Sequence, residues 1–149
     1  MCDAVEYQHN NKRQFVYFIN PYARLPVRKR CGADTLQTWG RRRDEPGSLP
    51  RGGWASHDSI HAGLWDRWFP RPVQIAAQRF LMRDIHGSTQ WYPITRGHWL
   101  QGLLATEGDE IRLYVVTLTP GMPDAIHERW PRLVSKTGNT TQHINLPAS

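Results

Sequence analysis

The residue with the clearest capacity for covalent chemistry is Cys2, which directly follows Met1. Removal of Met1 leaves Cys2 with a free α-amine beside its own thiol. Such a 1,2-aminothiol attacks an aldehyde through nitrogen to form an imine, and the thiol then closes a five-membered thiazolidine ring. This closure is intramolecular, so its entropic cost is small. With a reference pKa of about 7.7–8.0, roughly a tenth to a sixth of the amine is nucleophilic at pH 7.

A second reactive group is the imidazole of His127, which follows a dense apolar run over residues 111–116. The run predicts a buried strand of β-branched and aromatic residues, and Pro120, Gly121 and Pro123 end it. A titratable side chain on a loop just past a core strand is a common position for catalytic groups. Most loop histidines are nevertheless structural or lie on the surface, so His127 alone does not define a site.

Four short segments occur in a fixed order along the chain. They are Met1-Cys2, Trp39-Gly40, Gly87-x-x-Gln90-Trp91 and Ala125-Ile126-His127-x-Arg129-x-Pro131. On these segments the chain resembles the SOS-response-associated peptidase (SRAP) family, whose members sense abasic sites in single-stranded DNA. In that family, methionine removal exposes the cysteine, which forms a thiazolidine cross-link with the ring-opened abasic sugar. The resemblance runs from Cys2 to about Leu133 and is dense near residues 1–2, 79–91 and 117–133.

The resemblance implies a role for each residue of the site. Cys2 is the nucleophile, Gln90 occupies the acid–base position, and His127 stabilises or protonates the opening sugar oxygen with Arg129 close by. The family has a glutamate where this chain has Gln90, and an amide has no pKa in the useful range for relaying a proton. Where the family has Asn-Ala-Arg-x-Glu, this chain has Trp54-Ala55-Ser56-His57-Asp58, so Trp54 replaces the asparagine that contacts the nucleotide. The resemblance implies no metal or organic cofactor.

The charge of the chain favours a polyanionic partner. Its formal net charge is +6 and its pI is near 9.8, with the positive charge carried mainly by arginine. Arginine next to aromatic side chains is the usual means of holding a single strand. We therefore predict that DNA contacts Trp39 as a stacking surface, the run Arg41, Arg42 and Arg43, and the residues Trp54 and Arg129. The alternative for the arginine run is a solvated loop.

The sequence leaves two alternatives to the cross-linker open. In the first, the chain is a non-covalent single-strand-binding module that kept the groove and lost the chemistry. In the second, it is a cysteine-type (auto)peptidase, a thiol hydrolase that pairs Cys2 with His127. His57 and His61 have the four-residue spacing of metal ligands, but no zinc signature includes them, so no metal site is predicted.

The chain of 149 residues is expected to form one α+β domain over residues 1–135, followed by a polar tail over residues 136–149. The resemblance implies a mainly antiparallel, barrel-like sheet with few helices. The patterns predict the following elements: strands over 14–19, 27–30, 36–39 and 73–82, a helix over 54–68 capped by Ser56, and a hairpin of 98–104 with 111–117.

The remaining expectations concern the surroundings of the protein. No apolar run reaches about 18 residues, which predicts no membrane span, and no leader is evident, which predicts a cytoplasmic protein. Cys2 and Cys31 are accordingly expected to be reduced thiols. We expect a monomer whose partner is single-stranded or abasic-site DNA.

Overall fold

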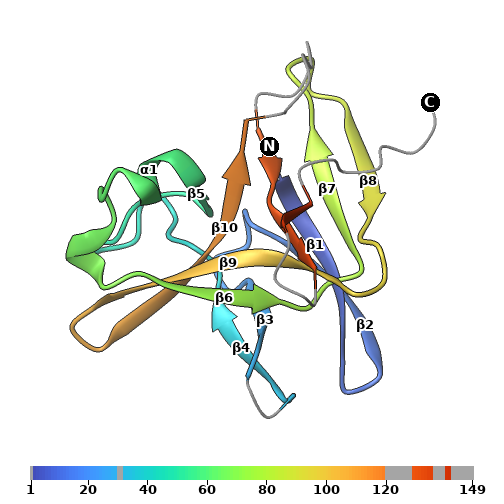
Figure 1. Ribbon diagram of the computed structural model, residues 1–149, viewed down its shortest axis with the longest axis horizontal. Helices are drawn as coiled ribbons and strands as arrows, with labels where there is room; N and C mark the ends of the chain where they lie inside the picture. The colour runs from blue at the N-terminus through green and yellow to red at the C-terminus, as the bar shows by residue number, and fades with distance from the viewer. Residues whose placement is uncertain (1, 30–31, 120–128, 136–139, 142–149) are drawn as a thin grey trace.

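The computed structural model describes residues 2–29, 32–119, 129–135 and 140–141, and these residues form a small, mainly β domain (Figure 1). The smaller of its two sheets is antiparallel and has the strand order β2-β1-β7-β8. Its strands are β1 (Cys2–His9), β2 (Lys12–Tyr17), β7 (Arg79–Arg83) and β8 (Thr89–Pro93). The strand β1 therefore lies inside this sheet, between β2 and β7.

The larger sheet has the strand order β11-β10-β9-β6-β3-β4. Its strands are β3 (Arg24–Arg28), β4 (Asp34–Thr38), β6 (Arg71–Ile75), β9 (His98–Glu107), β10 (Glu110–Leu118) and β11 (Trp130–Pro131). The strand β5 (Trp54–Ser56) adds to β10 in parallel. Two further strands, β12 (Leu133–Ser135) and β13 (Thr140–Thr141), pair with each other, and β12 also pairs with β9.

The β9–β10 hairpin forms the centre of the domain because apolar residues cover both of its faces. On one face Leu100 and Leu113 belong to the main core, which also contains Cys2. On the other face Leu103 and Tyr114 pack in a second cluster with Trp65. A strand buried on both sides needs an apolar residue at nearly every position, which explains the dense apolar run over 111–116.

The larger sheet curls but forms no closed barrel within the described residues. An isolated parallel bridge joins Trp39, just after β4, to Leu113 of β10. No ladder of hydrogen bonds continues from this bridge, because the chain turns away at Gly40, whose φ is 58°. The predicted antiparallel sheet with few helices is thus observed, and the barrel-like closure is limited to this curl.

Two predicted elements differ from the structure. The predicted helix over 54–68 is instead the strand β5, the short helix α1 (His57–His61) and the 3₁₀-helix η1 (Asp66–Trp68). Ser56 does cap α1, but Gly63 adopts a φ of 79° and ends the helical path. The predicted strand over 73–82 is two strands, β6 and β7, which belong to different sheets.

The predicted hairpin is confirmed as β9 and β10, joined at Gly108. Among the described residues, the helices are all too short or too polar to cross a lipid bilayer. Most of the predicted polar tail lies outside the described residues, apart from β13.

Candidate nucleic-acid interface

A β-bulge at the start of β1 determines where Cys2 points. The pairing of β1 with β7 joins Cys2 to Met82 and Ala4 to Leu81, so Asp3 is an extra residue in the ladder. Alternation along an unbroken strand would place Cys2 on the same face as Ala4. The bulge shifts that alternation, and Cys2 instead joins Val5 in the main core. Bulges often re-aim a side chain in this way beside functional sites.

The thiol of Cys2 is buried and held in its protonated form. Cys2 is 1% exposed, and its Sγ donates to the carbonyl oxygen of Ala4 at 3.7 Å. Burial, with a smaller contribution from Asp3, raises the pKa of the Cys2 thiol to about 12. The thiolate is the nucleophilic form of cysteine, so Cys2 is unreactive in this conformation.

Gln90 lies level with Cys2 on the same sheet, and its side chain is exposed. Cys2 pairs with Met82 of β7, and Met82 pairs with Gln90 of β8. The two backbones are therefore two strand spacings, or about 10 Å, apart. Gln90 shares its side of β8 with Tyr92, whose hydroxyl donates to Gln90 Oε1 at 3.3 Å. Tyr92 belongs to the core cluster that contains Cys2.

Residues 129–131 are the described end of the segment that carries the predicted His127. Trp130, within them, packs in the main core that contains Cys2. The Trp130 ring lies 5.1 Å from the Tyr92 ring and 6.2 Å from the Phe80 ring, between centroids. Arg129 is partly buried, and its Nη1 has no hydrogen-bond partner among the described residues. His127 itself lies outside the described residues. Cys2, Tyr92 and Trp130 thus belong to one core cluster, and Gln90 is joined to it by the hydrogen bond from Tyr92.

A pocket of about 650 Å³ opens beside this end of β1, on the other side from the thiol. Five arginines and one aspartate line it, which leaves a formal excess of four positive charges. The lining residues are Asp3, Tyr17, Phe18, Ile19, Arg41, Arg42, Arg43, Arg51, Gly52 and Arg83. We call this feature the arginine pocket. Asp3, the bulge residue, is part of its wall and directly follows Cys2.

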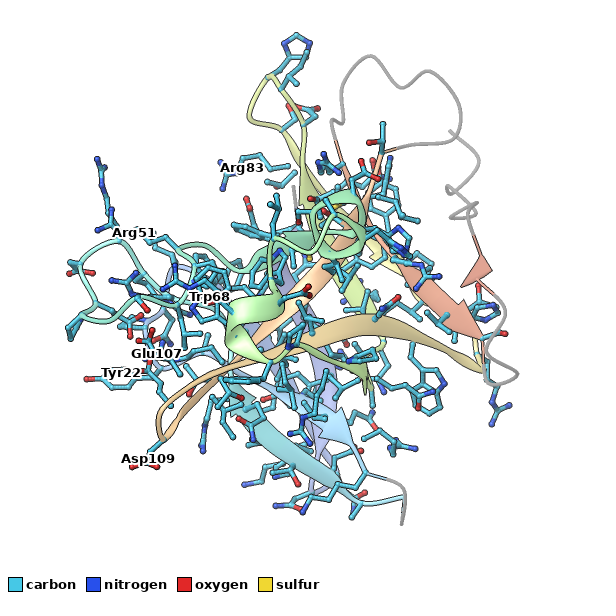
Figure 2. The ribbon with its side chains drawn as sticks, turned by 60° about the vertical axis from the view of Figure 1, so that its left-hand side comes forward. Tyr22, Arg51, Trp68, Arg83, Glu107 and Asp109 are labelled. Atoms are coloured by element: carbon cyan, nitrogen blue, oxygen red, sulfur yellow. The ribbon has the colours of Figure 1, made fainter. Side chains whose placement is uncertain are left out.

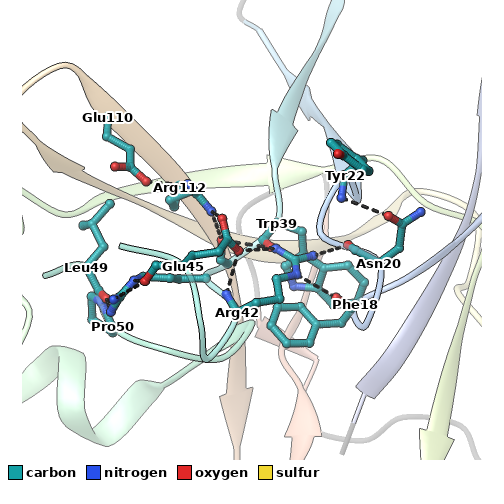
Figure 3. A network of polar contacts seen from close by, with 12 residues as sticks. Phe18, Asn20, Tyr22, Trp39, Arg42, Glu45, Leu49, Pro50, Glu110 and Arg112 are labelled. Carbon is teal, nitrogen blue, oxygen red and sulfur yellow. Dashed lines mark hydrogen bonds and ion pairs between the residues drawn. The ribbon is translucent and has the colours of Figure 1, made fainter. Parts of the chain in front are cut away.

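The inner wall of the arginine pocket is built by Arg42, whose guanidinium group is almost fully hydrogen-bonded (Figure 3). Its Nε donates to the Phe18 carbonyl at 2.9 Å, and its Nη2 donates to the Asn20 carbonyl at 2.7 Å. Its Nη1 donates to the Trp39 carbonyl and lies 3.8 Å from a carboxylate oxygen of Glu45. The guanidinium also lies over the Phe18 ring, 4.3 Å from its centroid. Arg42 therefore joins residues 18–20 to the irregular segment that follows β4.

Arg41 has a similar structural role on the neighbouring loop. Its Nη1 donates to the Leu49 carbonyl at 2.9 Å, and its Nε and Nη2 both donate to the Glu45 carbonyl. Its own backbone forms a bridge with Gly52. Arg41 and Arg42 are 7% and 8% exposed, so they give the inner wall positive charge but offer a ligand little surface.

The rim of the arginine pocket is exposed. Arg43 and Arg51 are exposed, and no described residue accepts a hydrogen bond from either guanidinium group. Arg83 is also exposed and forms an ion pair of 2.5 Å with the Asp3 carboxylate. Figure 2 shows Arg51 and Arg83 extending outward from the ribbon.

Apolar side chains accompany the exposed arginines at the end of β2. Tyr17 is 45% exposed and Ile19 is 86% exposed. Phe15, one position along the same side of β2, packs edge-on against Trp91 with 5.7 Å between ring centroids. The guanidinium of Arg79 lies over Trp91 at 5.2 Å. The outer face of the smaller sheet is thus an aromatic surface continuous with the pocket through Tyr17.

The two tryptophans predicted to contact DNA lie beneath the pocket. Trp39 is 0% exposed, and its Nε1 donates to the Gly53 carbonyl at 2.9 Å, so in this conformation no base can stack on its ring. Trp54 is partly buried, and its ring lies 4.9 Å from that of Phe18. Both rings therefore support Phe18, which itself lines the pocket.

Sequence reasoning did not identify Tyr17, Ile19 and Arg83 as site residues. A signal was present in β2, where aromatic residues alternate with others in a strand that has one solvent-facing side. The position of Arg83 depends on a pairing between β1 and β7, which are more than 70 residues apart in sequence. No local pattern in the sequence reports such a pairing.

Comparisons with known proteins add no relative to this description. The chain matches no protein-family model, no curated protein and no solved structure. Within the described part of the chain, no three histidine, cysteine, aspartate or glutamate side chains cluster as a metal site would require.

Proposed function

We propose that this protein binds single-stranded DNA in the arginine pocket and, once Met1 is removed, cross-links through Cys2 to an abasic site. The observation that carries the proposal is the position of the pocket. Exposed arginines and exposed aromatic and aliphatic side chains surround Asp3, the residue directly after Cys2. A DNA strand held there passes beside the amino end of β1.

The non-covalent part of the proposal rests on charge and stacking. Arg43 and Arg51 would contact phosphates, while Tyr17 and Ile19 would contact the flat faces of bases. Base–aromatic stacking is worth about 1–3 kcal/mol per base and tolerates any sequence. The aromatic surface of Phe15 and Trp91 would extend this path across the outer face of the smaller sheet.

The covalent step uses both groups of Cys2 and needs no oxidant or reductant. The α-amine attacks C1 of the ring-opened sugar aldehyde, and loss of one water gives an imine. The Cys2 sulfur then adds to the imine carbon, and the thiol proton passes to the nitrogen. The product is a thiazolidine, with one water released for each adduct.

This chemistry requires the thiol to leave the core, because Cys2 is 1% exposed and its side chain packs in the main core. The amine, one residue from the pocket wall, is the group that would react first. The resemblance to the SRAP family supports this order of steps and gives Gln90 the acid–base position. An amide at that position can orient water or the amine by hydrogen bonds but cannot carry a proton away.

The proposal is tested with two forms of the chain, one that retains Met1 and one that begins at Cys2. Each is incubated with a single strand that carries one abasic site, and adducts are read by denaturing gel and intact mass. We expect a heat-stable adduct, at the mass of protein plus DNA minus one water, from the form that begins at Cys2 only. Gln90→Glu should accelerate its formation by supplying the missing carboxylate.

The controls separate the two parts of the proposal. Cys2→Ala in the processed form should bind the strand and yield no thiazolidine; a stable adduct from this variant would disprove the mechanism. Absence of any adduct with binding retained would identify a non-covalent single-strand binder. Absence of binding to a fluorescent 15-nucleotide strand at low salt would reject the arginine pocket as a DNA site.

A further inference from the structure

We propose that His57 and His61 form a binding site for one divalent transition-metal ion of the Ni²⁺ or Cu²⁺ type, with water in the remaining coordination positions. The site is separate from the arginine pocket and does not depend on the proposed DNA-binding function. The observation that carries it is a short contact between two ring nitrogens. His57 Nε2 and His61 Nε2 are 3.0 Å apart.

The local sequence fixes both histidines on one side of α1. Residues four apart lie one above the other on a helix, and His57 and His61 have this spacing. Ser56 caps the helix by accepting from the Ser59 backbone N–H at 3.2 Å. The Ser59 hydroxyl also accepts from Trp65 Nε1 at 2.9 Å, which ties α1 to the core below it. The backbone that carries the pair is thus well anchored although the helix is short.

The two rings converge on a common point. Their centroids are 4.2 Å apart, whereas their Nε2 atoms are 3.0 Å apart, so the rings approach through these nitrogens. An ion at the usual metal–imidazole distance of about 2.0–2.1 Å from both nitrogens would have an N–metal–N angle of about 94°. That angle suits square-planar or octahedral ions better than tetrahedral Zn²⁺, and it favours Cu²⁺ and Ni²⁺.

The protonation state of the pair is compatible with metal binding. Two N–H groups cannot point at each other across 3.0 Å, so at most one of the two Nε2 atoms carries a proton. One Nε2 of the pair therefore carries a lone pair directed at the other ring, and loss of the shared proton makes both nitrogens available to a metal ion.

The coordination shell would be open. No third histidine, cysteine, aspartate or glutamate joins the pair among the residues that the structure describes. Two imidazoles on a solvent-accessible helix leave positions for water or for an exogenous ligand. The site should therefore bind reversibly and exchange its outer ligands quickly, unlike a closed structural metal site.

The test is a titration of the full chain, without a purification tag, with NiCl₂ in a non-coordinating buffer by isothermal calorimetry. Ni²⁺ is the probe because it does not oxidise thiols. We expect one site that is weakened at least tenfold in His57→Ala and in His61→Ala. The control is His86→Ala, which removes an exposed histidine in the β7–β8 turn and should leave binding unchanged.

The order of metals provides a second readout. Affinity at this pair should rise from Zn²⁺ to Ni²⁺ to Cu²⁺, and saturating Ni²⁺ should raise the melting temperature of the wild type but not of either variant. Circular dichroism confirms that the variants are folded, and His61→Gln replaces His61→Ala if that variant is not. Unchanged Ni²⁺ affinity in both single variants, or no binding by the wild type, would overturn the proposal.

Discussion

Arg42 and Arg43 are neighbours in the sequence, and the fold places their guanidinium groups in opposite surroundings. Arg42 is 8% exposed and donates to the carbonyls of Phe18, Asn20 and Trp39. Arg43 is exposed, and no described residue accepts a hydrogen bond from its side chain. Both side chains line the same pocket.

The comparison shows that some residues give a site its charge, whereas others are exposed enough to contact a ligand. The inner arginines satisfy backbone carbonyls that the irregular segment after β4 would otherwise leave without donors. Arg41 and Arg42 carry two positive charges, and Glu45 is the one acidic side chain that pairs with Arg42 among the described residues. The two arginines therefore still make the electrostatic potential in the pocket more positive. At the rim, no described residue accepts a hydrogen bond from Arg43 or Arg51, so their donors are available for a ligand.

The largest effect is expected from Arg42→Ala. This change removes hydrogen bonds from a charged donor to the carbonyls of Phe18, Asn20 and Trp39 and should lower the free energy of unfolding by about 3 kcal/mol. Urea denaturation followed by circular dichroism measures the loss. Arg42→Lys should recover only part of it, because lysine lacks the planar fork. A loss below about 1 kcal/mol would mean that Arg42 is not structural.

The next effect is expected from Tyr17→Ala and concerns the proposed binding of single-stranded DNA. Loss of one stacked base should weaken binding to a single strand by about 1–3 kcal/mol, which is about 5- to 150-fold. Because the side chain is 45% exposed, stability should change by less than about 0.5 kcal/mol. Fluorescence anisotropy with a labelled strand measures the affinity. Tyr17→Phe, which keeps the ring, should bind as the wild type does.

The double variant Arg43→Ala/Arg51→Ala should give a smaller change that depends on salt. If each side chain contacts one phosphate, the slope of log affinity against log salt should decrease in magnitude by about 1.4. The double lysine variant is the matched control and should retain the slope. Equal loss of stability in the double alanine variant and in Arg42→Ala would remove the distinction between wall and rim.

The smallest effect concerns Glu45, which accepts from the Arg42 backbone N–H at 2.8 Å and from Arg112 Nη1 at 3.0 Å. Burial opposes ionisation, but these two donors outweigh it and hold the pKa of Glu45 below its usual value. A lowered carboxyl pKa stabilises the fold above the unfolded-state pKa of about 4.3 and loses that contribution as pH falls below it. Wild type should lose more stability than Glu45→Gln between pH 5 and pH 3 by chemical denaturation. Parallel curves for the two proteins would contradict this assignment.

Local pattern predicted the parts of the fold whose contacts are local. The β9–β10 hairpin was predicted because its strands are dense in apolar residues and adjacent in the chain. The break between β6 and β7 was not predicted, because Ala76 and Ala77 continue the apolar run where the chain passes from one sheet to the other. Gly63 ended the predicted helix through its positive φ, which composition alone did not reveal.

The candidate site was only partly predictable for a related reason. Charge and the order of motifs pointed to Cys2, Gln90 and the arginine run, and the structure places Cys2 and Gln90 level on one sheet. Trp39 is buried where an isolated bridge joins it to Leu113 of β10, just before the turn at Gly40. The inward orientation of Cys2 depends on one extra residue in a ladder, and no propensity scale predicts a bulge at a named position.

The pairing of Cys2 with Met82 also has a consequence for the time course of synthesis. The residue that pairs with Cys2 in the sheet is made about 80 residues later, which at 5–20 residues per second is about 4–16 s. During that interval β1 can pair only with β2, whose ladder begins at Ala4, so Cys2 has no partner strand. The ribosome's pace thus sets a window in which the Cys2 thiol is open to solvent before the core encloses it.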